Sequence, residues 1–474
     1  MSHAAETSED SQRVPRLDHR ARPGLVLIWN RARPTCSVLP LQNSKLELGR
    51  AHQPELFGDD ERVSRLHCLL EFSSSEFWLT DRESRNGTYL NGERIHARTQ
   101  VTGRALIRIG QSLAMAVHDV RPYATEPLVD GAGVVLGAAL RQAWLEIELA
   151  AHAGSTLYLR GESGSGKELA ARAFHDRATR GVSGAPFIAV NCAAVPEGLA
   201  ERLLFGAKRG AYSGATTDVE GYVQAAHRGT LFLDEIAELE PKVQAKLLRV
   251  LESREVLALG ATRAQAVDLR VCVAAHQSLR ELVSSGRFRE DLFYRLARPE
   301  VRLAPLRERL DELPWLIWGE VARVLDEAGT TSASPSTMDS TQSPLTSTLL
   351  IEACALRHWP GNVRELKAEI RRAAHRAIRA GAPRVGEEHL DAEAGQPLRA
   401  EAQAEEHEGM QKANIDDVRI REVLTECGGN VSQAARVLGW HRNQLRRWLA
   451  KQASPNPDAE SPTLAAAAQE HEDR

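Results

Sequence analysis

The chain has 474 residues, of which 42% are hydrophobic and 26% are charged, and its formal net charge is −4. This length predicts about three domains rather than one core, and the small net charge excludes a uniformly basic surface, so any DNA-binding region must be local. The six cysteines lack the CxxC or Cys/His spacing of a zinc site. Without a long apolar run or a signal-peptide pattern, the composition predicts a cytoplasmic protein with reduced thiols.

The N-terminal quarter of the chain changes character at residue 23. Residues 1–22 are polar and charged, which predicts a disordered arm. From 23 to 121, short apolar segments such as Leu25–Trp29 alternate with turn residues. This spacing predicts an all-β sandwich.

Three polar loops of this sandwich carry side chains suited to a phosphate group: Leu48-Gly49-Arg50, Val63-Ser64-Arg65-Leu66-His67 and Asp81 to Thr88. A guanidinium, a hydroxyl and an amide at one end of a sandwich can bind a phosphate dianion by charge-assisted hydrogen bonds. Together the loops resemble those of forkhead-associated (FHA) domains, over about residues 25–120. The resemblance implies a phosphothreonine site formed by Arg50, Ser64, Arg65, Arg85 and Asn86, with His67 tying the loops together. An FHA scaffold that binds no phosphate is the alternative, against which Arg50 and Ser64 argue.

The centre of the chain alternates strand and helix patterns. Residues 134–311 predict an α/β subdomain with a mainly parallel sheet. Residues 312–385 predict a helical subdomain that carries a Ser-, Thr- and Pro-rich insert at 329–347. An acidic linker is expected at 386–411, because 386–408 hold eight acidic residues and one arginine.

A glycine-rich loop follows the apolar strand Thr156–Leu159 and precedes a helical stretch. Strand, glycine loop and helix in this order form a phosphate-binding loop, in which backbone N–H groups surround phosphate oxygens and a lysine reaches the β- and γ-phosphates. The buried strand Leu231-Phe232-Leu233 ends in Asp234 and Glu235, a Walker B pair that holds Mg²⁺ and polarises the attacking water. The predicted ATP-binding residues are Gly161, Glu162, Ser163, Gly164, Ser165, Gly166, Lys167 and Glu168.

Between these two motifs stands a glycine-flanked hexapeptide with one aromatic residue: Gly210, Ala211, Tyr212, Ser213, Gly214 and Ala215. It resembles the GAFTGA loop of bacterial enhancer-binding proteins, the AAA+ activators of sigma-54 RNA polymerase, whose P-loop resembles GESGTGKE. The resemblance implies that these six residues contact sigma-54. Tyr212 and Ser213 replace phenylalanine and threonine and keep the aromatic ring and the β-hydroxyl.

The same resemblance assigns further roles in ATP hydrolysis. Asn191 matches the asparagine that holds the catalytic glutamate inactive, Arg289 and Arg295 match arginines donated to a neighbouring subunit of a hexamer, and Arg364 matches sensor II. Because Glu168 stands where other P-loops have Ser or Thr, Mg²⁺ is expected to rely on Asp234 and water. Ala275 takes the place of the threonine of sensor I, with His276 next to it.

A compact basic segment at 412–452 resembles a Fis-type helix-turn-helix, an all-α DNA-binding domain, and residues 453–474 form a low-complexity tail. In the expected recognition helix, Trp440 to Leu449, the apolar positions recur with helical spacing, and the polar side chains are of the kind that read base edges and phosphates. The expected DNA-binding residues are Arg442, Asn443, Gln444, Arg446 and Arg447.

Together these resemblances predict a sigma-54-dependent transcriptional regulator. Its AAA+ ring, assembled from dimers into a hexamer, would hydrolyse ATP to remodel the sigma-54 RNA polymerase closed complex at a promoter looped to enhancer DNA. A phosphothreonine protein from a kinase pathway, bound at the FHA domain, would gate this activity. The alternative is a DNA-binding regulator with an impaired ring that acts without sigma-54.

Overall fold

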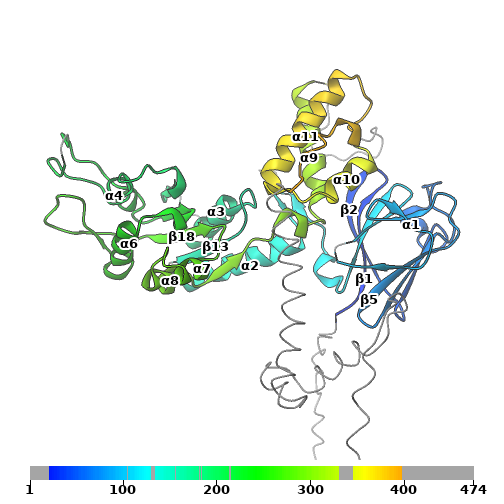
Figure 1. Cartoon of the computed structure of the whole chain (residues 1–474), viewed down its shortest axis with the longest axis horizontal. Helices are drawn as coiled ribbons and strands as arrows, with labels where there is room; N and C mark the ends of the chain where they lie inside the picture. Colours follow the sequence, from blue (N-terminus) through cyan, green and yellow to red (C-terminus); the bar gives the residue numbers. More distant parts are fainter. Residues whose placement is uncertain are drawn as a thin grey trace, which may run out of the picture. The chain divides into compact units, whose positions relative to one another are not determined.

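The computed structural model describes residues 21–397, except 104, 130–133, 155, 181, 183, 213–214 and 330–344. The chain divides into two compact units, Met1–Gln396 and Pro397–Arg474, and the first unit is described below (Figure 1). Most of the predicted N-terminal arm and of the 329–347 insert, and all of 412–474, lie outside the described residues.

Two antiparallel sheets form the N-terminal part, which confirms the expected all-β sandwich. Leu25 and Leu27 of one sheet and Leu70 and Leu79 of the other belong to one buried core. The first sheet has the order β2 (Arg33–Pro40), β1 (Gly24–Asn30), β10 (Ser112–Val117), β9 (Leu106–Ile109), β6 (Thr88–Leu90) and β7 (Glu93–Arg94). The second has the order β3 (Lys45–Leu48), β4 (Cys68–Ser73), β5 (Glu76–Asp81) and β8 (Thr99–Val101), with the short helix α1 (Pro54–Phe57) before β4.

The central part is built on a parallel sheet, as the alternating pattern predicts. Its order is β14 (Phe187–Asn191), β15 (Thr230–Asp234), β18 (Arg270–Ala275), β13 (Thr156–Arg160) and β19 (Glu300–Arg302). The strands that end in the phosphate-binding loop and in the Walker B acids are thus separated only by β18, whose last residue is Ala275. Because parallel strands end at one edge, the motifs after β13, β15 and β18 meet there.

Helices cover both faces of this sheet (Figure 1). One face packs on α2 (Ala138–Ala153) and α3 (Lys167–Ala178), where Leu157, Phe232 and Ala274 share a core with them. The opposite face, with Tyr158, Leu233 and Val273, packs against the remaining helices. These are α4 (Ala200–Phe205), α5 (Tyr222–Ala225), α6 (Pro241–Ser253), α7 (Leu279–Ser284) and α8 (Glu290–Leu296). Two small ribbons complete this part: β11 (Leu128–Val129) with β12 (Val135–Leu136), and β16 (Glu255–Val256) with β17 (Gln265–Ala266).

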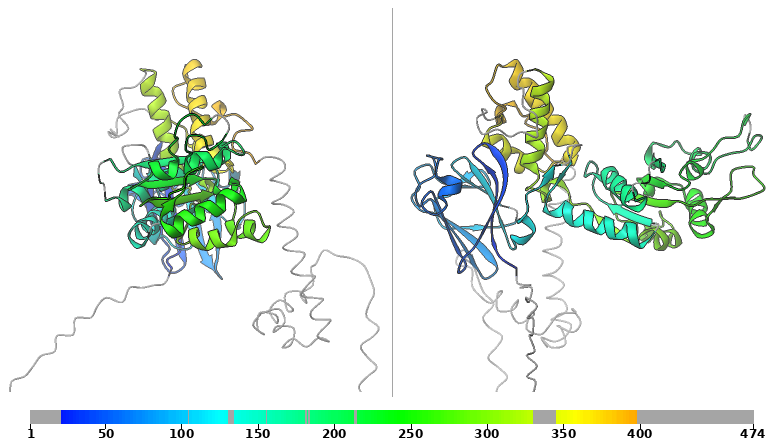
Figure 2. Two further views of the ribbon diagram at one scale, coloured as in Figure 1. Left: turned by 90° about the vertical axis from the view of Figure 1, so that its left-hand side faces the viewer. Right: turned by 180° about the vertical axis from the view of Figure 1, so that it is seen from behind.

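The helical lid consists of α9 (Leu313–Glu327), α10 (Thr348–Ala355) and α11 (Asn362–Arg379). Its core also contains Trp29 and other side chains of the first sheet of the sandwich. Helix α9 contacts β2 and α10 contacts β10, and the lid helices stand beside the dark-blue strands in the right-hand view of Figure 2.

The start of the predicted acidic linker is a difference between sequence and structure. Residues 386–397 fold back on the lid instead of forming a linker, because His389 is buried and the amides of His358 and Trp359 donate to the Gly395 carbonyl at 2.9 and 3.0 Å. Arg376 also donates to the carbonyl of His389 at 2.6 Å. The acidic composition concealed these apolar and backbone contacts.

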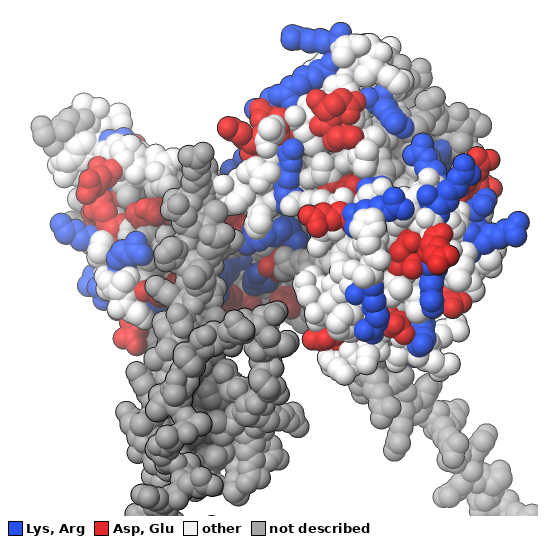
Figure 3. Space-filling model, turned by 45° about the vertical axis from the view of Figure 1, so that its right-hand side comes forward, with Lys and Arg blue, Asp and Glu red and all other residues white. Residues whose placement is uncertain are grey.

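Basic and acidic side chains are interspersed over the described part of the face that Figure 3 shows. In the described residues, no helix combines the length and the hydropathy required to cross a membrane.

Candidate functional site

The phosphate-binding loop connects β13 to α3 and takes a conformation that requires glycine. Gly164 and Gly166 have φ of +73° and +107°, in the left-handed region that side chains disfavour. A Cβ on Gly164 would also stand 2.2 Å from the carbonyl oxygen of Gly361 in the lid. The loop therefore lies directly against the lid, and the N-terminus of α3 opens into the cavity between them.

Lys167 is the first residue of α3 and is almost completely buried. Its ammonium group donates to the carbonyl of Gly161 at 3.0 Å and to Glu235 Oε1 at 3.1 Å. Glu235 follows β15 with a left-handed φ of +51°, a strained conformation that is common at functional sites. The phosphate-binding lysine and the second Walker B acid are thus paired.

The two Walker B carboxylates have pKa values shifted in opposite directions. Burial raises the pKa of Asp234, against the opposing charge of Lys167. Burial alone would also raise the pKa of Glu235, but the hydrogen bond from His276 and the charge of Lys167 outweigh it and lower that pKa. Glu235 is therefore the more firmly ionised of the two, and an ionised carboxylate can orient water by accepting a hydrogen bond from it.

His276 is the partner of Glu235 that sequence reasoning missed. Its Nδ1 lies 2.7 Å from Glu235 Oε2. The predicted partner, Asn191, lines the same pocket, but its side-chain oxygen accepts from the amide of Ala193 at 3.0 Å. Ala275, where the related regulators have threonine, is fully buried in the sheet. The sequence signal for His276 was its place beside Ala275, at the expected sensor I position after β18.

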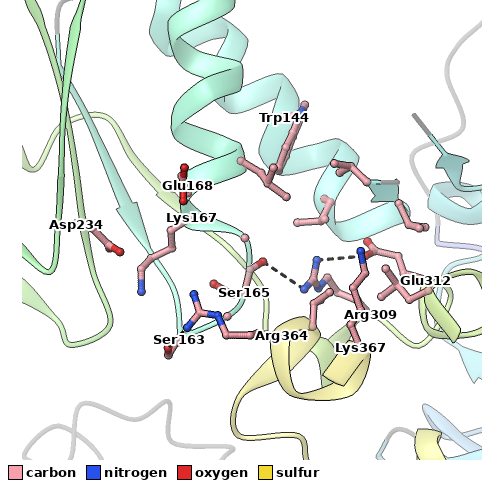
Figure 4. A pocket seen from close by; sticks show the side chains of 18 of the residues that line it. Trp144, Ser163, Ser165, Lys167, Glu168, Asp234, Arg309, Glu312, Arg364 and Lys367 are labelled. Atoms are coloured by element: carbon pink, nitrogen blue, oxygen red, sulfur yellow. Dashed lines mark hydrogen bonds and ion pairs between the residues drawn. The ribbon is translucent and has the colours of Figure 1, made fainter. Parts of the chain in front are cut away.

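The lid closes the other side of the pocket. Arg364 on α11 lies 3.4 Å from the hydroxyl of Ser163, as the sensor II prediction requires of a residue near the P-loop. The buried Arg309 reaches the carbonyl of Ser165 at 3.4 Å and Glu312 at 3.2 Å. Figure 4 shows Lys167, Asp234 and Arg364 converging on one end of the pocket.

Two further residues, which sequence reasoning also missed, brace Glu162 of the loop. Arg307 holds the Glu162 carboxylate with two hydrogen bonds of 2.9 and 2.7 Å. Asn362 donates to Glu162 Oε2 and to the carbonyl of Ser163, both at 3.0 Å. These contacts join the loop to the first turn of α11, so that lid and loop position each other.

The pocket has the size and chemistry that a nucleoside triphosphate requires. It has a volume of about 430 Å³. One end has the cations and carboxylates described above, and the other has apolar side chains suited to a base: Val134, Val135, Leu140, Trp144, Leu316 and Val363. The hydroxyl of Ser165 is buried without a partner in the described residues, and a phosphate oxygen or a hydrated cation would satisfy it.

The two predicted trans arginines lie elsewhere on the α/β subdomain. Arg289 precedes α8 and is held by Asp291 at 2.7 Å, and Arg295 donates to the carbonyl of Leu251 at 3.1 Å. Both are exposed, and neither is among the described residues that line the pocket of their own chain.

The hexapeptide 210–215 follows α4 as a narrow loop, in which the amide of Gly210 donates to the carbonyl of Ala215 at 2.9 Å. Tyr212 is partly exposed, and its hydroxyl accepts a hydrogen bond of 2.8 Å from Arg202. A neighbouring loop supports it, because a Cβ on Gly260 would stand 2.8 Å from the Cβ of Ala211. Ser213 and Gly214 lie outside the described residues.

The predicted phosphothreonine residues come together on adjacent loops of the sandwich. Arg50 donates its backbone amide to the carbonyl of Ser64 at 3.1 Å, and the Ser64 hydroxyl accepts from the amide of Arg85 at 3.1 Å. The Nε of Arg50 is buried without a partner in the described residues. Arg65, Arg85 and Asn86 are exposed around it. An anion would satisfy the unpaired guanidinium nitrogen.

His67 ties these loops together from beneath. Its Nδ1 accepts from the amide of Ser64 at 3.0 Å, and its Nε2 lies 3.2 Å from the carbonyl of Gly87, so the ring is neutral with the proton on Nε2. Burial lowers the pKa of His67, although the Gly87 carbonyl opposes this. The structure thus places His67 in the supporting role that the resemblance implied.

Comparison with known proteins agrees with this geometry. Residues 135–302 match the family model of the sigma-54 interaction domain, 46–110 that of the FHA domain, and 413–451 that of the bacterial regulatory proteins of the Fis family. ZraR of Klebsiella oxytoca is 34% identical over 348 residues, which cover 73% of this chain and 74% of ZraR. The chain belongs to the sigma-54-dependent transcriptional regulators. It is a member with an FHA domain and a sigma-54 interaction domain.

Other relatives of this sigma-54 regulator match over less of their length. The transcriptional regulatory protein XylR of Pseudomonas putida is 37% identical over 64% of this chain and 54% of XylR. The Nif-specific regulatory protein of Herbaspirillum seropedicae is 41% identical over 50% of this chain and 42% of that protein. The chain thus spans about half the length of these two relatives. A structure of NtrX from Brucella abortus in complex with ATP is similar over 69% of this chain and 70% of NtrX, with 28% identity and a TM-score of 0.47.

The Fis-family match covers the predicted DNA-binding residues Arg442, Asn443, Gln444, Arg446 and Arg447. All five lie outside the described residues, so their roles stay predictions.

Proposed function

We propose that this regulator hydrolyses ATP in order to remodel the sigma-54 RNA polymerase closed complex, and that phosphothreonine binding at the FHA loops controls this activity. One observation carries the proposal. The ionised Glu235 lies at the end of β15 inside the nucleotide pocket, held by Lys167 and His276. This is the position from which a carboxylate can orient and deprotonate the attacking water.

Each side chain of the pocket has a role in this reaction. Lys167 and the N-terminus of α3 bind the β- and γ-phosphates. Arg364 binds the nucleotide from the lid. Asp234 and water would hold Mg²⁺, and the bound ion would neutralise the negative charge that develops on the phosphoryl group. Glu235 acts once a phosphate has drawn Lys167 away. Asn191, close by in the pocket, is the proposed partner of Glu235 in the inactive state of the cycle.

Completion of the site by a second subunit is part of the proposal. Arg289 and Arg295 are exposed and lie outside their own pocket, as arginines that act in trans must. A guanidinium from a neighbour stabilises charge on the transferred phosphoryl group. A ring, by family resemblance a hexamer built from dimers, places each arginine pair at the next pocket.

The sigma-54 contact is assigned to residues 210–215. The loop leaves the helical face of the sheet between α4 and α5 and presents Tyr212 partly to solvent. Gly210, at φ of +82°, permits the backbone rearrangement that a moving loop needs. We propose that the aromatic ring of Tyr212 and the hydroxyl of Ser213 make the contact.

The remaining partners follow from the two flanking domains. The Fis-type segment reads a palindromic enhancer through its arginines and Asn443. At the other end, the unpaired Nε of Arg50, with Ser64, Arg65, Arg85 and Asn86 around it, supports a phosphothreonine protein as the input.

The test is Glu235→Gln, which keeps the size and polarity of the side chain but removes the base. We expect the variant to bind ATP and to lose both ATP hydrolysis and open-complex formation at a sigma-54 promoter. Glu238→Gln, an exposed change three residues further on, is the matched control. Open-complex formation that survives in Glu235→Gln would overturn the mechanism, and a wild-type chain that binds DNA without opening the promoter would favour a regulator with an impaired ring.

A further inference from the structure

Strand β1 of the first sheet of the FHA sandwich is buried on both faces. In β1, Leu25 and Leu27 point into the sandwich core, whereas Val26 and Ile28 belong to the core of the lid. A break in register between Leu27 and Trp29 turns Trp29 to the lid side as well. The uninterrupted apolar run Leu25–Trp29 is the sequence signature of a strand that is covered on both sides.

Trp29 is the centre of this FHA–lid joint, which we define as the contact of β1, β9 and β10 with α9 and α10. Its ring is fully buried and lies 6.2 Å from the ring of Trp318 on α9. Its indole N–H donates to the hydroxyl of Thr348 on α10 at 3.1 Å. Thr348 in turn donates to the carbonyl of Gln111 at 3.2 Å. Apolar packing and directional hydrogen bonds therefore fix the same residue.

A nearly buried ion pair lies at the edge of the joint. Arg108 Nε of β9 contacts Glu352 Oε2 of α10 at 2.8 Å, with side-chain exposures of 15% and 7%. Burial raises the pKa of Glu352, which Arg108 opposes. The guanidinium of Arg108 also stacks 3.7 Å above the ring of Tyr89. This nearly buried pair holds β9 and α10 in one relative position, because displacing either partner would leave an uncompensated charge.

Both ends of this joint lead to a ligand site. Tyr89 lies in β6, three residues after Asn86 in the phosphothreonine loop. On the lid, α9 carries Leu316 in the nucleotide pocket and Trp318 against Trp29, only two positions apart. Helix α9 therefore lines the nucleotide pocket and packs on the FHA sheet within one turn.

We propose that the FHA–lid joint couples nucleotide occupancy of the AAA+ pocket to the FHA loops through Trp318–Trp29 and through Glu352–Arg108–Tyr89. The lid is the shared element, since it lines the pocket and also packs on the sheet. Binding linkage is reciprocal, so a ligand of the FHA loops changes nucleotide affinity by the same factor. Only the second direction, from a ligand of the FHA loops to nucleotide affinity, rests on the proposed phosphothreonine function.

The experiment measures hydrogen exchange of the whole chain with and without ADP. In the wild type, ADP slows exchange in the phosphate-binding loop and alters exchange in peptides that cover 84–90 and 106–117. In Arg108→Met, which keeps a long apolar side chain but removes the charge, the phosphate-loop response remains and the response at 84–90 is lost. Trp29→Phe, which keeps an aromatic ring without the N–H donor, weakens the response at 106–117.

Arg98→Met is the matched control, because Arg98 pairs with Glu71 at 3.3 Å and stacks 4.3 Å above Trp78 on the other sheet. It should leave the ADP response unchanged. The proposal is overturned if ADP protects the phosphate-binding loop without any change at 84–90, or if that change persists in Arg108→Met. Neither readout requires a phosphopeptide, so failure of the phosphothreonine function would be seen separately.

Discussion

Two sites for anions occur in one chain and are built in opposite ways. In the AAA+ pocket the main cation, Lys167, is buried and paired with Glu235 before any phosphate arrives. In the FHA loops, Arg50 has an unpaired Nε, and a neutral histidine, His67, fixes the loops. During the proposed ATPase cycle Lys167 must exchange Glu235 for a phosphate, whereas the FHA loops only have to bind a phosphate. In this chain the catalytic lysine is held in an internal ion pair, whereas the Nε of Arg50 has no partner among the described residues.

The largest effect tests the paired site. Lys167→Ala removes two charge-assisted hydrogen bonds to phosphate, at roughly 1.5–3 kcal/mol each, so nucleotide affinity should fall by at least about 100-fold. Titration with a fluorescent ATP analogue measures it. Lys242→Ala, on the exposed surface of α6, should bind as the wild type does, and an affinity within tenfold for Lys167→Ala would contradict the assigned role.

Arg50→Ala tests the open site in the same way. Loss of one charge-assisted contact, roughly 1.5–3 kcal/mol, predicts about 10- to 100-fold weaker retention of a phosphothreonine peptide pool. Because the Nε of Arg50 has no hydrogen-bond partner among the described residues, Arg50→Ala breaks no such bond, and the free energy of unfolding should change little. Arg82→Ala, at an exposed arginine of the third loop to which no phosphate contact is assigned, is the control. Undiminished retention by Arg50→Ala would show that another surface binds the phosphate.

Lowering the pH should affect the FHA loops through the buried His67. Burial holds its pKa below the ordinary 6.5, so below that pH the unfolded chain binds a proton that the folded chain does not. The contribution of His67 to the free energy of unfolding is then fully present above about pH 6.5. As the pH falls from there to the pKa of the folded state, this contribution decreases by up to about 1.4 kcal/mol per pH unit. Urea unfolding of the whole chain, followed by tryptophan fluorescence at a series of pH values, measures this slope. His67→Gln should reduce the slope but not abolish it, because burial also lowers the pKa of His175; an unchanged slope would refute the neutral buried ring.

The smallest effect concerns the brace of the phosphate-binding loop. Arg307 and Glu162 are about one-third exposed, and such pairs contribute about 0–1 kcal/mol. Arg307→Gln should therefore weaken nucleotide binding by less than about fivefold, against the far larger loss in Lys167→Ala. A loss as large as that of Lys167→Ala would mean that the brace, and not the buried lysine, dominates the site.

Local motifs made the ATP site largely predictable. Lys167, Asp234 and Glu235 follow from strand ends and a glycine pattern, and the parallel sheet brings them together. His276 and Asn362 did not follow, because their roles depend on which strand lies between two others and on how the lid closes. No spacing along the chain encodes those distances.

The FHA sandwich was also predictable from the sequence only in part. Short strands predicted its fold, and the ligand residues assigned from its three polar loops stay a prediction. The contact with the lid was missed, although Leu25–Trp29 carries the signal, because an apolar run alone does not say which partner covers it. The fold of 386–397 was missed for the opposite reason, since its acids masked the buried His389.

The core that joins Trp29 to the lid has a consequence for handling the protein. A shortened chain that begins after residue 121 would leave Ile317, Val321 and Ile351 without the apolar side chains that now cover them. Exposed patches of this kind drive self-association. A deletion intended to relieve regulation would therefore risk insolubility, and exchange of the FHA domain for another input domain would require a matching change of lid surface.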